Sequence, residues 1–458
     1  MKVTFIGGGS LRLLPLFRGM FKRAPQMWEN GEIRLFDLKQ DRAEAVAALV
    51  QACPEFQNVK NCKVFCPGSM EEALQDIDAL YLSMAAERNP SLTQARIASY
   101  DRNIYPSDQL SLDGAFLSLR LGGLILNIAK KMEVLCPKAM MLIFANPVSV
   151  YSYMVNTYTK IQALGICGGF NNHRWDLTRM IFGKDECDEK WNVVAAGVNH
   201  LSYILRGEYE GEDLYSSICP RYLNDSWKCM PGQELACETL YKAYRQYGTL
   251  IFSTESDGIA QLYPEVALAH LKERFLKDRD SFDPALSGAE DKKRMDARFA
   301  SFIEQSKHPE TVKWTSDDPS IDGLYGVREW DITLPVFKAV AGLEKMRIVA
   351  SRPNYGVIRD LPYSCAVEYT MDVFKNEITP VEDQYIPRPF YGLTASLTEF
   401  QTLIADAIAT HDNHLFANAL AAFPQHVFTD NKRQLILELF DIYADVDPYM
   451  LEAKKYFL

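Results

Sequence analysis

The chain has 458 residues, a formal net charge of −11, 48% hydrophobic residues and 24% charged residues. This length is too great for one small core and favours two domains packed together. The negative charge argues against nucleic acid as a partner, because the phosphate backbone would be repelled. Apolar runs fall short of the roughly 20 residues that span a membrane, so we expect no membrane partner.

The expected compartment is the reducing cytoplasm. The first residues enter an apolar stretch directly, without the pattern of a secretory signal. The ten cysteines are scattered and form no C-x-x-C pair, so the sequence indicates neither a zinc knuckle nor a redox motif.

Short apolar runs alternate with helical patterns in the first 200 residues. Each run is too short for a helix and is followed by a turn signal. The predicted strands are Lys2–Ile6, Glu32–Phe36, Ala79–Met84, Met140–Phe144 and Ala163–Cys167. This alternation is typical of a parallel sheet with helices on both faces.

A long crossover helix is predicted at Ala115–Cys136, where apolar residues recur at helical spacing and Pro137 marks the end. From about Gly197 the pattern changes to longer helical stretches and a polar insertion at Asp278–Asp296. We therefore expect a Rossmann-type α/β domain at residues 1–195, with a doubly wound parallel sheet. A mixed α+β domain for substrate and oligomerisation should follow at residues 196–458.

A nucleotide site is predicted after the first strand, where small residues lead into a helix: Gly7, Gly8, Gly9 and Ser10. Such a turn lets backbone N–H groups approach a pyrophosphate. Arg12 stands where the usual fingerprint has a third Gly, and a plain strand-to-helix joint would look the same. Asp37 directly follows the second strand, where a carboxylate can bind the adenosine ribose and repel a 2′-phosphate. NAD is thus favoured over NADP.

Asn146 follows the strand Met140–Phe144 and precedes Pro147, which places an amide at the carboxyl edge of the sheet. It can bind the nicotinamide ribose or a substrate hydroxyl there. The alternative is an ordinary turn residue before proline.

Cys167 stands at the end of the next predicted strand, at the same edge, and His200 lies downstream in an apolar setting. A lone cysteine is more often a small buried apolar side chain than a ligand. Together, one thiolate and one imidazole make a candidate metal pair that leaves most of the coordination sphere open for substrate oxygens.

Several segments resemble glycoside hydrolase family 4 in order and spacing. They are IGGGS at residues 6–10, ANP at 145–147, GIC at 165–167 and GVNH at 197–200. Thr254-Glu255-Ser256 followed by Tyr263 resembles the α-galactosidase and α-galacturonidase-like branch, and residues 354–362 resemble the C-terminal segment of the family. The resemblance implies a Rossmann domain similar to that of lactate and malate dehydrogenases.

The resemblance also implies a redox glycosidase that uses NAD and a divalent metal, manganese above all, on a sugar substrate. NAD would take hydride from C3, the metal would acidify the C2 proton, and elimination and water addition would follow. Cys167 and His200 match the metal ligands, and Tyr263 matches the base at C2. Arg328 matches a family arginine and is a candidate to lower the pKa of Tyr263. Family members also imply a homodimer or homotetramer.

Further residues match the substrate side of the family. Asp108 keeps a carboxylate of an acidic loop and would hold a water at the metal, although it can equally be a solvated loop acid. Arg88, Arg96 and Asn354 match substrate-binding positions.

Departures from the family lie around the substrate. Gly168 stands where members carry Asp, Asn or His after the metal-ligand Cys, and Asp113 replaces a Gly. These changes suggest an altered sugar preference, such as a uronic acid. One alternative is a dehydrogenase acting on a sugar or hydroxy acid, which would need no Cys/His pair. Another is a non-catalytic paralogue that senses nucleotide or sugar.

Overall fold

One continuous sheet organises the chain. The computed structural model describes residues 1–84, 90–184, 190–224, 234–253, 257–269, 284–315, 324–328, 331–425 and 429–458. Across these ranges the main path of the 13-stranded sheet has the order β10-β8-β7-β12-β11-β6-β5-β4-β1-β2-β3.

The first half of the sheet is parallel. Its strands, in spatial order, are β3 (Lys63–Phe65), β2 (Glu32–Phe36), β1 (Lys2–Ile6), β4 (Ala79–Leu82), β5 (Met140–Ile143) and β6 (Ala163–Gly165). This 3-2-1-4-5-6 order is the Rossmann order, so the predicted fold class is confirmed. The predicted strands are confirmed to within two residues at their ends. The prediction missed β3, whose three residues are too few to show a period.

The second half is antiparallel and joins the first where Ser351 pairs with Gly165. Its strands are β11 (Met346–Pro353), β12 (Ala366–Phe374), β7 (Trp191–Val198), β8 (Leu201–Tyr209) and β10 (Ile251–Ser253), with β13 (Glu377–Pro380) on β12 and β9 (Glu212–Asp213) on β8. Residue 195, the predicted boundary, lies inside β7. The two predicted domains therefore share one sheet, and the boundary marks a change in strand direction.

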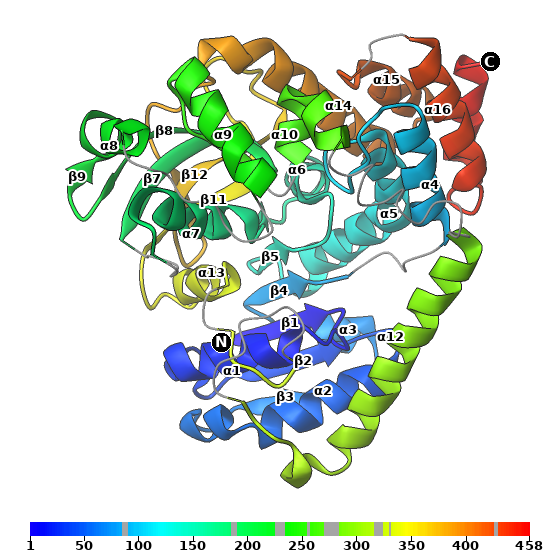
Figure 1. Cartoon of the computed structure of the whole chain (residues 1–458). Coiled ribbons are helices and arrows are strands. Elements are labelled where there is room, and N and C mark those ends of the chain that lie inside the picture. The colour runs from blue at the N-terminus through cyan, green and yellow to red at the C-terminus, as the bar shows by residue number, and fades with distance from the viewer. Residues whose placement is uncertain are drawn as a thin grey trace.

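Helices cover both faces of the sheet (Figure 1). On one side lie α1 (Leu13–Arg23) and α2 (Gln40–Ala52), and on the other lie α5 (Leu112–Leu135), α6 (Val148–Tyr158) and α14 (Tyr391–Thr410), which contact one another. The predicted crossover helix is confirmed as α5. Its first turn is capped by Ser111, whose hydroxyl accepts from the backbone N–H groups of Asp113 and Gly114.

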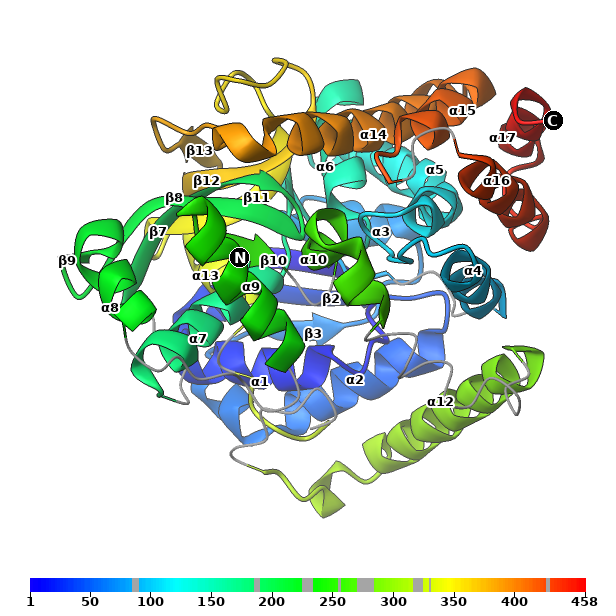
Figure 2. The ribbon, with the colours of Figure 1, turned by 45° about the horizontal axis from the view of Figure 1, so that its top comes forward.

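An outlying helix, α12 (Pro284–Ser306), lies along α2 and α4 (Pro90–Asp101) at the margin of the molecule (Figure 2). It contains the part of the predicted polar insertion that the structure describes. The other helices are α3 (Met70–Leu74), α7 (Gly169–Phe182), α8 (Cys219–Asn224), α9 (Glu234–Tyr247), α10 (Asp257–Leu262), α13 (Thr333–Val340), α15 (Asn413–Ala422), α16 (Asp430–Ile442) and α17 (Pro448–Leu451).

Among the described residues, α5 is the single helix long and apolar enough to cross a membrane. It contacts α6, α14 and α16, and most of its apolar stretch is buried inside the protein. Core helices of globular proteins share these properties, so α5 is weak evidence for a membrane span.

Candidate active site

The glycine loop after β1 lies tightly against two neighbouring strands. Gly7 has φ +84°, and a Cβ there would meet the Ser83 backbone at 2.9 Å. A Cβ on Gly8 would meet the backbone nitrogen of Phe36 at 2.7 Å. Both glycines also donate backbone N–H groups to the carbonyl of Phe36, at 3.0 and 2.9 Å. Side chains are excluded here, as close approach of a dinucleotide to the backbone requires.

Asp37 lies beside this loop at the end of β2. Its Oδ2 accepts the backbone N–H of Gly9 at 2.9 Å, and its Oδ1 accepts that of Lys39 at 2.8 Å. The side chain remains partly exposed, so its oxygens can accept further hydrogen bonds from a ribose. Ser10 closes the turn by donating its N–H to the carbonyl of Gly7. The predicted residues of the glycine loop and Asp37 therefore form one connected arrangement that fits an adenosine ribose. Asn146, also predicted to bind NAD, lies outside this arrangement, after β5.

Arg12, which replaces the third fingerprint glycine, is fixed at the start of α1. Its guanidinium lies 3.7 Å from the ring centre of Phe144 and forms an ion pair with buried Asp331 at 2.5 Å. Arg328 lies 3.9 Å from the same carboxylate. Burial acts to raise the pKa of the Asp331 carboxyl, but Arg12, the hydrogen bonds from Thr333 and finally Arg328 hold it below its usual value. This cluster joins the glycine-loop helix to the segment before α13.

Asp108 and Asn146 meet at the carboxyl end of β5. Asn146 donates its amide to Oδ2 of Asp108 at 2.9 Å and accepts a hydrogen bond from the side chain of Gln109. Gln109 in turn accepts the backbone N–H of Val148 at 3.2 Å, at the start of α6. Two loops that are 38 residues apart in sequence thus form one polar surface, as expected for a substrate site.

Cys167 and His200 face each other at the neighbouring edge position. Sγ of Cys167 lies 3.6 Å from Nε2 of His200, whose side chain is 9% exposed. Ligand distances of about 2.3 Å to sulfur and about 2.1 Å to nitrogen would give an angle of about 110° at a shared ion. The pair therefore fits a divalent metal. Among the described residues, no group of three or more His, Cys, Asp or Glu side chains is arranged as metal ligands.

Asp257 contacts Nδ1 of His200, the ring nitrogen that does not face Cys167. Its Oδ2 lies 2.7 Å from Nδ1 of His200 and accepts the hydroxyl of Ser107 at 2.6 Å. Burial acts to lower the pKa of His200, but neighbouring Cys167 and Asp257 raise it well above its ordinary value. A carboxylate at Nδ1 keeps that nitrogen protonated and turns the Nε2 lone pair toward a metal, the usual outer arrangement of metal-binding histidines.

His200 also occupies an unusual backbone conformation. Asn199 and His200 form the tight turn between β7 and β8, and φ of His200 is +72°. Residues other than glycine adopt this region rarely, and such strain concentrates at functional sites. Asn199 is anchored by its amide, which donates to Glu368 Oε2 at 2.7 Å, and Ser202 donates to Oε1 of the same carboxylate at 3.0 Å. Buried Glu368 therefore holds the turn.

Tyr263 follows α10, the short helix that Asp257 begins. Its hydroxyl donates to Oε1 of Gln246 at 3.3 Å. Burial and the adjacent Tyr247 raise the pKa of Tyr263 to about 12. The Arg328 guanidinium lies 3.9 Å from Asp331. Its effect on the pKa of Tyr263 stays a prediction.

The substrate-side residues are divided. Arg88 lies outside the described residues. Arg96, on α4, is partly buried and lowers the pKa of Tyr100 and of Asp113 against the larger effect of burial. Asp113 is 1% exposed, and burial raises its pKa to about 7.

Asn354, a predicted substrate residue, closes the loop after β11. The side chain is fully buried, and its amide donates to the carbonyls of Ile358, Leu361 and Pro362 at 2.8–3.2 Å. Its oxygen accepts the N–H of Ile358 at 2.7 Å. An asparagine amide has two donor hydrogens, and both are used within this loop.

Sequence reasoning missed three residues of the site: Asp257, Gln109 and Glu368. Asp257 directly follows the Thr254-Glu255-Ser256 segment, and an acid so near a candidate base was a usable signal. Gln109 and Glu368 gave none, because their importance depends on contacts with distant residues.

Comparison with known proteins decides the family. A family model described as family 4 glycosyl hydrolase matches residues 2–181, and the C-terminal domain model of the same family matches residues 195–425. The chain belongs to glycosyl hydrolase family 4. The matched ranges contain both halves of the site, Cys167 in the first and His200 in the second.

Curated relatives of this family 4 chain are distant. An alpha-galacturonidase from Thermoanaerobacter italicus is 22% identical over 467 residues, which cover 96% of each chain. An alpha-galactosidase from Bacillus subtilis is 23% identical over 349 residues, which cover 76% of this chain and 75% of the relative.

Solved structures share the fold of the family 4 chain. A 6-phospho-alpha-glucosidase from gut microorganisms, in complex with NAD and Mn²⁺, superposes with a TM-score of 0.75 at 17% identity over 98% of each chain. A malate dehydrogenase from Plasmodium falciparum reaches a TM-score of 0.50 at 12% identity, covering 89% of this chain and 99% of that one. The expected likeness to malate dehydrogenase is confirmed at the level of fold.

Gly168 differs from the Asp, Asn or His expected after the metal-ligand Cys in this family. It precedes α7 with φ −69° and ψ −17°, and a Cβ there would meet no atom of the described residues within 4 Å.

Proposed function

We propose that this chain is an NAD- and manganese-dependent glycosidase that hydrolyses α-galactosides or α-galacturonides. The observation that carries the proposal is the meeting of Cys167, His200 and Asp257 at the carboxyl edge of a Rossmann sheet. The distant relatives named alpha-galacturonidase and alpha-galactosidase support the sugar class, and the related structure with NAD and Mn²⁺ supports the cofactors.

The residues divide the chemistry among them. When bound, NAD would supply a hydride acceptor for C3 of the sugar, and the divalent ion would supply a Lewis acid for the resulting carbonyl. Cys167 and His200 would hold the ion, while Asp257 keeps the imidazole in the required tautomer. The glycine loop and Asp37 would hold the dinucleotide. These groups lie at one sheet edge, where open α/β folds bind ligands.

Tyr263 would take the proton from C2. Its pKa of about 12 in the ligand-free protein is too high for a base at neutral pH, so the positive charge of the bound ion must lower it. Its hydrogen bond to Gln246 must also break for the phenol to reach substrate. Asp108 and Asn146 provide polar groups for sugar hydroxyls or for water near the reacting carbons.

The test is an activity screen with NAD, Mn²⁺ and a reducing thiol. p-Nitrophenyl glycosides of both anomers should include neutral, uronic and phosphorylated sugars. We expect release of nitrophenol from α-galactosides or α-galacturonides without net NADH, and deuterium from solvent at C2 of the product. Tyr263→Phe should lower turnover about 10²- to 10⁴-fold and remove the C2 label, while NAD binding stays unchanged.

Other outcomes would contradict the proposal. Net NADH on a hydroxy acid, with activity that survives chelation, would show a dehydrogenase. Failure to bind Mn²⁺, together with no hydrolysis of any glycoside, would favour a non-catalytic paralogue.

A further inference from the structure

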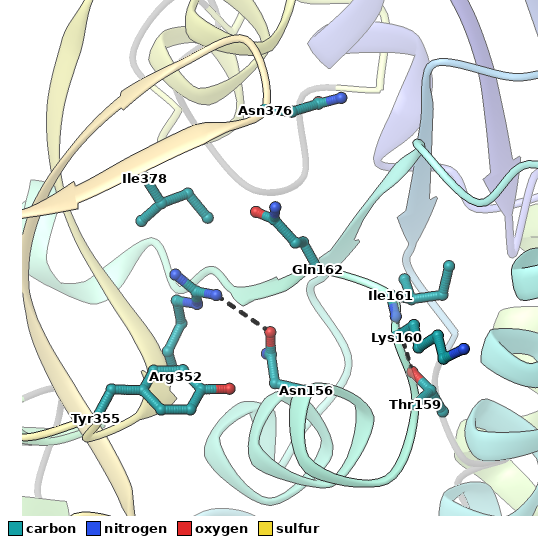
Figure 3. Close-up of a pocket in the computed structure, with 9 residues that line it drawn as sticks. All are labelled: Asn156, Thr159, Lys160, Ile161, Gln162, Arg352, Tyr355, Asn376 and Ile378. Atoms are coloured by element: carbon teal, nitrogen blue, oxygen red, sulfur yellow. Dashed lines mark hydrogen bonds between the residues drawn. The ribbon is translucent and has the colours of Figure 1, made fainter.

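A second pocket opens far from the metal pair, at the opposite end of the parallel strands. It has a volume of about 300 Å³. Gln162, which lines the pocket, comes directly before the first residue of β6. Cys167 comes after the last residue of that strand, at its other end. The walls come from the end of α6, from β11 and the turn after it, and from the β12–β13 hairpin, as Figure 3 shows.

Arg352 is the main charged group of this pocket. One Nη donates to Oδ1 of Asn156 at 3.3 Å, and the guanidinium carbon lies 5.6 Å from the ring centre of Tyr355. Asn156 is itself fixed, because its amide donates to the carbonyls of Ser152 and Ala163 at 2.7 and 2.8 Å. The guanidinium is therefore held in place before any ligand arrives.

Within the described part of the chain no carboxylate forms an ion pair with Arg352, which contacts Asn156 and the ring of Tyr355 instead. A guanidinium held in a fixed position presents a fork of donors that matches carboxylate or phosphate oxygens. In a chain of net charge −11, an unneutralised arginine in a pocket is best explained by an anion.

The remaining lining fits a hydroxylated ligand. Figure 3 shows the Gln162 amide rising into the pocket between Arg352 and Ile378. That amide makes no hydrogen bond in the described ranges and is exposed, so it can bind a hydroxyl. Tyr355, 40% exposed, adds a flat apolar ring beside the guanidinium.

From this arrangement we infer that the pocket binds a small polyhydroxylated anion, such as a sugar acid or sugar phosphate, with its oxyanion on Arg352. The inference is independent of the proposed glycosidase activity, since it uses none of the residues assigned to that site.

The experiment is hydrogen exchange measured by mass spectrometry on the protein loaded with NAD and Mn²⁺. The probes are galacturonate, galactose 1-phosphate and neutral galactose. We expect at least one anion to protect residues 156–162 and 374–380, and galactose to leave them unchanged. Arg352→Gln should weaken the apparent affinity at these segments at least tenfold, and Arg352→Lys should weaken it less because the charge remains. Whichever anion protects identifies carboxylate or phosphate as the source.

Arg347→Gln is the matched control. Arg347 lies on the same strand, but its charge is paired with Asp372 at 2.9 Å, so its substitution should not change protection at the pocket. Equal protection in Arg352→Gln and the unaltered protein would overturn the inference. So would protection by galactose, or protection confined to residues 165–169 and 198–202 around the metal pair.

Discussion

Oδ2 of Asp257 lies 2.7 Å from Nδ1 of His200, while Nε2 of the same ring faces Sγ of Cys167 at 3.6 Å. The imidazole therefore has one nitrogen committed to a buried carboxylate and the other available to a metal. This relationship makes Asp257 a positioning residue, because it would act on the metal only through His200.

Removal of Asp257 should weaken metal binding. We expect Asp257→Ala to raise the dissociation constant for Mn²⁺ about 10- to 100-fold, because the ring loses the group that fixes its tautomer and direction. Asp257→Asn, which keeps a hydrogen-bond acceptor, should have a smaller effect. The measurement is the electron paramagnetic resonance signal of free Mn²⁺ during titration. Asp441→Asn, at an exposed carboxylate, is the control. Unchanged affinity in both Asp257 variants would refute the assignment.

Asp37 should control the choice of dinucleotide. Its carboxylate lies beside the glycine loop, and Asp37→Asn removes its negative charge while the shape remains. We expect about tenfold weaker NAD binding, which corresponds to one charge-assisted hydrogen bond. NADP binding should improve, because the repulsion of its 2′-phosphate disappears. Calorimetric titration with both dinucleotides measures the ratio. Asp41→Asn, at an exposed position in the first turn of α2, should leave that ratio as it is.

The parallel half of the fold was predictable because each of its strands can be recognised from its own short segment of sequence. Buried strands such as Lys2–Ile6 and Glu32–Phe36 are short apolar runs between turn signals, and their predicted ends match β1 and β2. The antiparallel half was not predictable. Its strands pair segments far apart in sequence, as when Glu368 of β12 pairs with Gly197 of β7.

In the candidate site, too, the positions of some residues could be predicted from local sequence, whereas the contacts of others could not. Cys167 and His200 could be placed at one sheet edge because each follows a predicted apolar segment in a family motif. Asn354 looked like a substrate residue from the same kind of match, yet its amide is used up by three carbonyls of its own loop. Arg328 was matched to a role beside Tyr263, and the structure places its guanidinium 3.9 Å from the Asp331 carboxylate. Side-chain partners of this kind are set by tertiary packing, which a motif does not encode.

Asp113 should make the protein less stable as pH rises. Burial raises the pKa of its carboxyl to about 7, above the ordinary value of 3.8. Between these two values the unfolded chain releases the proton and the folded chain keeps it. The contribution of Asp113 to stability is therefore full at low pH and is lost as pH rises through about 7.

Asp113→Asn should remove this dependence, because the amide stays neutral. Relative to the unaltered protein, the variant should gain on the order of 3 kcal/mol in unfolding free energy at pH 8 and little at pH 4. Urea unfolding at both pH values measures the difference, with Asp41→Asn as an exposed control. A difference of the same size at both pH values would show that the carboxyl is not protonated in the folded protein.

Gly168 tests the link between the missing side chain and the sugar class, and this test rests on the proposed function. The position has helical backbone angles, and a Cβ there meets no atom of the described residues within 4 Å, so we expect Gly168→Asp to fold normally. Aspartate at the start of α7 is also favourable to the helix. Its charge, however, would lie after Cys167, where a uronic carboxylate would be repelled.

We therefore expect Gly168→Asp to raise KM for p-nitrophenyl α-galacturonide several-fold, since a like charge at close range costs about 1 kcal/mol or more. KM for the neutral α-galactoside should change little. Gly168→Asn, of the same size without the charge, separates repulsion from crowding, because it should leave both KM values near those of the unaltered protein. Faster turnover of neutral α-galactosides by Gly168→Asp, with no cost on galacturonides, would contradict this account. Such a result would mean that the chain lacks an acid for the leaving group, and that the glycine is not an adaptation to a charged sugar.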